Sequence, residues 1–191
     1  TALGDYTGAD EAAKKLFYHE GAKFTATDYI TYADVLIHTG KPEEAVAAYE
    51  TAYNMNPEKN KQILADISEL YNKLENDAKS VEYMQKYVDT GDVTLQDYFI
   101  LSNRYKNLGL TLPEGSPERV EAANNGIKYI DLALESAANK GPLFRNKATL
   151  LMVRDGANNT PELIETYQAM IAAYDEDPEN INKYAEAYKT A

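Results

Sequence analysis

Few of the residue types that carry out catalysis occur in this chain, and those few are not grouped. It has two histidines, His19 and His38, and no cysteine. Neither histidine has a second histidine or a cysteine at the spacing of metal ligands. His38 precedes Gly40 at the expected end of a helix, where a cation interacts favourably with the helix dipole. We therefore interpret His38 as a capping or surface residue rather than a catalytic one.

The acidic runs and glycines do not form a recognisable site either. Residues 175–177 are three consecutive acids before Pro178, without the alternate spacing and the glycine of a calcium loop. The segment 155–159 does not place acids at alternate positions before its glycine. Phosphate-binding, dinucleotide-binding and nucleophile-elbow motifs are absent from the sequence. We predict no catalytic residue, no metal, no cofactor and no enzyme activity, although a pair of carboxylates that meets only in space would leave no motif.

Composition narrows the classes of partner. The 191 residues include 19 basic and 31 acidic side chains, so the formal net charge is −12. Phosphate backbones are bound by clustered lysines and arginines, so this balance argues against nucleic acid and against an anionic membrane surface. No run of 18 apolar residues occurs, which predicts no membrane insertion. The charge is compatible with a neutral or basic partner.

The elements that would position any site follow a repeat. Tyr29 and Leu64 are 35 positions apart, Leu64 and Tyr98 are 34 apart, and small and apolar residues follow each at similar offsets. A period of this length indicates stacked supersecondary units rather than one globular core. The first block contains Tyr29, Tyr32, Ala33, Leu36, Gly40, Ala45, Tyr49, Ala52 and Pro57, and the later blocks contain Ile67, Ser68, Tyr71, Ser80, Met84, Tyr87, Leu101, Ser102 and Tyr105.

These residues and their spacing resemble the tetratricopeptide repeat, a helix–turn–helix unit of about 34 residues. Tyr29 stands at the large aromatic position, Ala33 at the glycine position, and Pro57 closes the unit. The resemblance covers nearly the whole chain and implies an all-α fold: an α-solenoid (right-handed superhelix) of about ten helices. The expected helices are 9–20, 26–39, 42–55, 60–73, 77–89, 94–108, 117–138, 142–154, 161–175 and 179–190.

The domain organisation expected from this resemblance is a single array. Partial units at 1–25 and 179–191 would flank complete units at 26–60, 61–94, 95–140 and 141–178. Because the two ends resemble half-units, we expect the chain to be part of a longer protein. Insertions at 110–116 and 155–160 interrupt the period. Gly21, Gly40, Gly91, Gly109 and Gly141 are expected helix stops.

The resemblance also implies where a partner binds, because the first helices of such units line the concave groove. The residues not needed for packing would form an acidic-to-neutral surface with Ile30, Ile37 and Phe99 as apolar anchors, which favours a neutral or basic peptide or protein segment. Capture of an acidic tail is not supported, since Ile30, Asp34, Asp66, Gln96 and Ile100 occupy the slots where a well-known subgroup has cations. The expected partner-binding residues are Thr27, Ile30, Asp34, Ile37, Gln62, Ala65, Glu69, Asn72, Gln96, Phe99, Asn103 and Lys106.

Two alternatives stay open. The chain has sixteen tyrosines, which we interpret mainly as packing residues between helices, but a groove rich in Tyr and Asn would suit a small molecule or a glycan. The segment would otherwise be a regulatory appendage of an enzyme or a secretion component. Homo-oligomer formation stays open. The cysteine-free style resembles envelope tetratricopeptide proteins of anaerobic bacteria, which favours the cell envelope over the cytoplasm.

Overall fold

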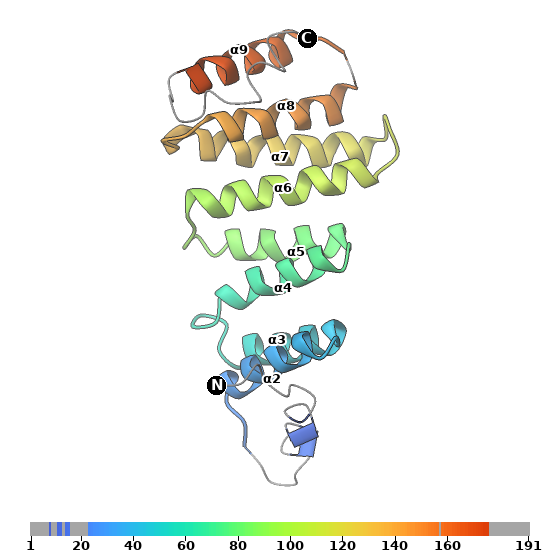
Figure 1. The fold of residues 1–191 in the computed structure, drawn as a ribbon, viewed down its shortest axis with the longest axis vertical. Helices are drawn as coiled ribbons and strands as arrows, with labels where there is room; N and C mark the ends of the chain where they lie inside the picture. The colour runs from blue at the N-terminus through green and yellow to red at the C-terminus, as the bar shows by residue number, and fades with distance from the viewer. Residues whose placement is uncertain (1–7, 9–10, 13, 16–22, 157, 176–191) are drawn as a thin grey trace. The chain divides into compact units, whose positions relative to one another are not determined.

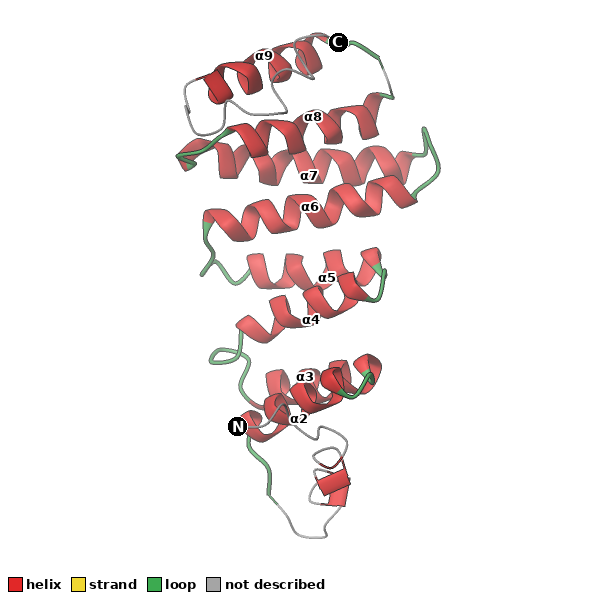
Figure 2. Cartoon of the chain, viewed as in Figure 1, coloured by secondary structure: helices red, strands yellow, loops and turns green. Residues whose placement is uncertain are grey.

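The structure, a computed structural model, describes residues 8, 11–12, 14–15, 23–156 and 158–175. Across this part of the chain all regular structure is helical, with turns and loops between the helices (Figures 1 and 2). The helices are α2 (Ala26–His38), α3 (Pro42–Met55), α4 (Gln62–Lys73), α5 (Asp77–Val88), α6 (Leu95–Thr111), α7 (Pro117–Ser136), α8 (Gly141–Asp155) and α9 (Pro161–Asp175).

Eight of the ten expected helices are thereby confirmed, and their ends differ by only a few residues. The helix expected at 179–190 and most of the one expected at 9–20 lie outside the described residues. Two expected helix stops were wrong. Gly109 lies inside α6, which continues to Thr111, and Gly141 begins α8. Both glycines permit close contact instead, since a Cβ would lie 2.8 Å from Val153 Cγ1 at Gly109 and 2.8 Å from the Tyr174 ring at Gly141.

Local sequence explains where several helices begin. Thr25 and Thr94 each accept a bond from the amide of the residue three positions on, and Asp28 and Asp97 accept one back from the cap residue's amide. These reciprocal bonds form a capping box at each helix start and satisfy amides that the helix leaves free. The expected stop at Gly40 has φ of 75°, a left-handed conformation that favours glycine.

The helices group into two compact units, residues 1–90 and 91–191. In the first, α2 packs on α3 and α4 packs on α5, with α3 against α4 between the two hairpins. Small residues stand where the helices of each hairpin meet: Ala33 and Ala45 are both fully buried. In the next hairpin Ser68 Oγ donates to the Ser80 carbonyl at 2.7 Å, and Ser80 Oγ donates to the Ser68 carbonyl at 2.9 Å.

In the second unit α6 packs on α7, α7 on α8, and α8 on α9, and α6 also contacts α8. Its buried core includes Ile130, Leu150 and Leu151. The small-residue position recurs as Ser102, fully buried, whose Oγ donates to the Gly126 carbonyl at 2.9 Å. Each helix therefore packs against the next one in the chain within its unit, while the division into repeat units and the single continuous array stay predictions.

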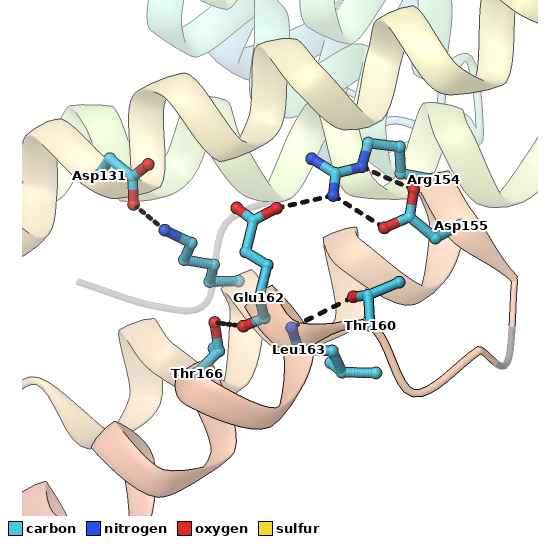
Figure 3. A network of polar contacts seen from close by, with 8 residues as sticks. Asp131, Arg154, Asp155, Thr160, Glu162, Leu163 and Thr166 are labelled. Carbon is cyan, nitrogen blue, oxygen red and sulfur yellow. Dashed lines mark hydrogen bonds and ion pairs between the residues drawn. The ribbon is translucent and has the colours of Figure 1, made fainter.

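An ion pair links α8 and α9 near the turn between them, as Figure 3 shows. The Arg154 guanidinium donates to both oxygens of Asp155, at 2.8 and 2.7 Å, and to Glu162 of α9 at 2.7 Å. The hydrogen bond from Arg154 lowers the pKa of the Asp155 carboxyl below its ordinary value. The bond from Arg154 to Glu162 links the two helices, whereas Asp155 pairs with Arg154 at the end of α8 itself.

Candidate binding surfaces

The first candidate surface is formed by the exposed side of α2 and α4 in the first unit. Here the sequence predictions divide into two groups. Thr27, Asp34, Gln62 and Glu69 are exposed, whereas Ile30, Ile37, Ala65 and Asn72 are half-buried and contribute to packing as well.

Asp34 is not the uncommitted residue that the sequence suggested. Its carboxylate accepts a hydrogen bond from the Tyr49 hydroxyl of α3 at 2.7 Å, and Tyr49 is buried. Burial and this carboxylate raise the pKa of Tyr49. Asp34 therefore helps to fix the α2–α3 hairpin, and replacing it with lysine would leave the phenol without its acceptor.

Asp66 of α4 lies close enough to Asp34 to interact with it. Loss of solvent around its carboxyl, and then repulsion from Asp34, raise the pKa of Asp66 above its ordinary value, although the residue as a whole is exposed. Two neighbouring carboxylates give this surface a negative potential.

We expect Asp66→Asn to stabilise the first unit at neutral pH. A raised pKa means that the folded chain holds the proton more tightly than the unfolded chain, so the charged carboxylate destabilises the fold above that pKa. The gain at neutral pH should be below about 1 kcal/mol because solvent screens the site. It should vanish as the pH falls below the ordinary carboxyl pKa, and urea unfolding at several pH values measures it. A gain that persists undiminished in acid would contradict this account.

The second candidate surface is a pocket of about 190 Å³ between α6 and α8. Three of the predicted partner-binding residues lie together in its wall: Phe99, Asn103 and Lys106. Gln96 is exposed on the same helix but does not line the pocket. The remaining wall comes from α8, which the sequence prediction did not include, and consists of Pro142, Arg145, Asn146 and Thr149.

A buried chain of hydrogen bonds fixes one wall of the α6–α8 pocket. Asn146 is 5 % exposed, and its Nδ2 donates to Ser102 Oγ at 2.9 Å. Ser102 in turn donates to the Gly126 carbonyl, so three helices share one network. Among the described residues, Asn146 Oδ1 has no hydrogen-bond partner even though it is buried. A buried acceptor of this kind is destabilising unless another group donates to it.

The opposite wall of the pocket is cationic. Lys106 Nζ donates to Asn103 Oδ1 at 2.7 Å, and Asn103 Nδ2 donates to the Phe99 carbonyl at 3.0 Å. Burial, and secondarily the nearby Arg145 guanidinium, lower the pKa of Lys106. The acidic-to-neutral character expected for the first helices therefore does not extend to this pocket.

Within the described ranges no cluster of three or more His, Cys, Asp or Glu side chains could hold a metal ion. None of the described helices is both long enough and apolar enough to cross a membrane.

No known family profile matches the chain, and no curated protein matches it. Its fold, however, is found among solved structures. The C-terminal part of a TPR repeat-containing protein from Cytophaga hutchinsonii superposes with a TM-score of 0.69 at 14 % identity, covering 90 % of this chain and 62 % of that one. A MamA protein gives 0.63 at 11 % identity over 94 % and 88 %. MamA from Desulfovibrio magneticus RS-1 gives 0.62 at 12 % over 92 % and 89 %.

The chain has the tetratricopeptide-repeat fold. It spans less than two thirds of the length of the Cytophaga structure. The α6–α8 pocket includes Phe99, Asn103 and Lys106, three of the residues that the sequence analysis assigned to the groove, and the position of that groove stays a prediction. The α8 wall could have been predicted, because the sequence analysis already assigned residues 141–178 to a fourth repeat. The first helix of that repeat was not included among the groove residues.

Proposed function

We propose that this tetratricopeptide chain is a protein-interaction scaffold rather than an enzyme, and that the α2–α4 surface holds an extended, neutral or basic peptide segment. The observation that carries the proposal is the pair of neighbouring acids Asp34 and Asp66, in which loss of solvent and then the Asp34 carboxylate raise the pKa of Asp66. A lysine or arginine from a bound segment would relieve the repulsion from Asp34. The half-buried Ile30 and Ile37 would supply apolar contact beside it.

Charge removal on this surface should weaken binding without disturbing the hairpin. We expect Asp34→Asn combined with Glu69→Gln to reduce the affinity for a basic peptide about three- to thirtyfold, since each exposed ion pair contributes up to about 1 kcal/mol. Asparagine retains an oxygen that accepts the Tyr49 hydroxyl bond, so it is preferable to lysine here. The peptide is chosen by panning a random-peptide display library on the chain, and titration calorimetry gives the affinities.

A matched control removes two acids from a different surface. Glu121 and Glu135 are exposed on α7, so Glu121→Gln combined with Glu135→Gln changes the net charge equally but leaves α2 and α4 intact. This control should bind as the unaltered chain does. Enrichment of acidic peptides, or equal weakening by both double variants, would overturn the assignment of the surface.

The small-molecule alternative has one specific observation in its favour, the α6–α8 pocket with its unpartnered buried amide oxygen. Five of the described tyrosine rings, by contrast, contact one another between helices. Tyr71 stacks on Tyr83 with ring centroids 5.6 Å apart, and Tyr129 stacks with both Tyr98 and Tyr105 at 6.2 and 6.0 Å. These rings are used for packing, so they do not support a sugar-stacking platform. A role as an appendage of a longer protein stays compatible with either function.

A further inference from the structure

The α6–α8 pocket contains cationic side chains, which favour a negatively charged ligand, and hydrogen-bond acceptors, which favour a ligand with donor groups. Lys106 and Arg145 are cations that line one small space, and burial and then the Arg145 guanidinium lower the pKa of Lys106. A negatively charged group between them would remove the repulsion from Arg145 and gain charge-assisted hydrogen bonds. The two cations therefore favour an anionic ligand, although the chain as a whole is acidic.

The second requirement is for hydrogen-bond donors. Asn146 Oδ1 is buried and unpartnered within the described structure, whereas the Nδ2 of the same amide donates to Ser102. Thr149 donates its hydroxyl hydrogen to the Arg145 carbonyl at 3.1 Å, which leaves the hydroxyl oxygen as an acceptor. An inorganic anion such as sulfate has no donor to offer to either oxygen. A ligand that carries both a carboxylate and hydroxyl groups satisfies both walls.

Size and shape narrow the ligand further. A volume of about 190 Å³ is that of roughly six water molecules at about 30 Å³ each, which suits a single sugar ring or a single amino acid. Phe99 and Pro142 add an apolar wall against which a ring can lie. A peptide terminus offers one carboxylate and one backbone N–H, whereas a sugar acid offers one carboxylate and several hydroxyls. The second set matches the two acceptor oxygens.

We propose that the pocket between α6 and α8 is a binding site for a small hydroxylated carboxylate of monosaccharide size, of the hexuronate class. Lys106 and Arg145 hold the carboxylate, Asn146 Oδ1 and the Thr149 hydroxyl oxygen accept from ring hydroxyls, and Phe99 covers one face of the ring. The site belongs to the second compact unit alone and is independent of the peptide surface on α2 and α4.

The test titrates the full chain with D-glucuronate, D-glucose and N-acetylglycine, followed by calorimetry and by NMR of labelled asparagine side-chain amides. Glucuronate should bind saturably and shift the Asn146 amide signal. Glucose lacks the carboxylate and should bind at least about tenfold more weakly, because a hydrogen bond to a charged group contributes about 1.5–3 kcal/mol. N-acetylglycine has the carboxylate but a single donor, so it should also bind more weakly than glucuronate.

Two variants and one control make the test specific. Lys106→Gln and Thr149→Val should each weaken glucuronate binding, the first by about tenfold or more. Lys128→Gln, an equal loss of charge at an exposed position on α7, should leave the affinity unchanged. Thermal unfolding monitored by circular dichroism verifies that each variant is folded. The proposal is overturned if glucuronate does not bind, if Lys106→Gln binds as well as the unaltered chain, or if N-acetylglycine binds more tightly than glucuronate.

Discussion

Leu150→Ala is expected to destabilise the second unit by about 2–5 kcal/mol. Leu150 is fully buried in the core of α7, α8 and α9, and both of its methyl groups lie against the backbone of Gly126. Truncation removes buried apolar surface and leaves a gap that glycine, having no side chain, does nothing to fill. Urea unfolding followed by helical circular dichroism measures the loss as a lower midpoint.

The control for this substitution is a leucine on the surface. Leu110 is 53 % exposed near the end of α6, so Leu110→Ala should change the free energy of unfolding by no more than about 0.5 kcal/mol. Equal effects at the two leucines would mean that the α7–α8 packing described here does not hold the second unit together.

Gly126→Val should destabilise the same contact from the opposite side. A Cβ at Gly126 would lie 2.5 Å from Leu150 Cδ2 and 3.3 Å from Tyr105 Cβ, which is too close on both sides. Forcing atoms into a packed core costs typically about 1–3 kcal/mol, and valine carries two further methyl groups. Because glycine and valine are both weak helix formers, little helix propensity is gained in return. The expected result is a lower urea midpoint for the variant.

Combining the two substitutions tests whether they act on one contact. The space that Leu150→Ala vacates lies where the new valine must fit. The double variant should therefore be more stable than the sum of the single effects predicts, by about 0.5–3 kcal/mol. Simple additivity would show that the α7 and α8 backbones move apart rather than meet at these two residues.

Local signals explain why so much of the fold was predictable. The capping boxes at Thr25 and Thr94 and the left-handed glycine at Gly40 depend only on neighbouring residues, and the helix stop expected at Gly40 is confirmed. The buried small residues Ala33 and Ser68 were readable because they recur at the repeat spacing.

Gly126 and Gly109 could not be interpreted in the same way. The segment between Ser102 and Gly126 is longer than the one between Ser68 and Ser80, so the period no longer pointed to Gly126 as the partner of Ser102. Gly109 resembled a helix stop, because glycine occurs both at helix ends and inside helices where a side chain from another helix approaches closely. The residue type alone does not distinguish these two uses. What distinguishes them is Val153, more than forty positions away in the sequence.

The sequence by itself determined the all-helical repeat and the capped starts of α2 and α6, because periodicity and caps are properties of residues that lie close together in the chain. Only the tertiary structure decided which residues lie together. It places the Tyr49 hydroxyl in a hydrogen bond to Asp34, and it places Lys106 of α6 in one pocket with Arg145 and Asn146 of α8. Charge and unpaired hydrogen-bonding groups become a site only when separate helices enclose them, and the distances between helices are set by core packing rather than by spacing along the chain.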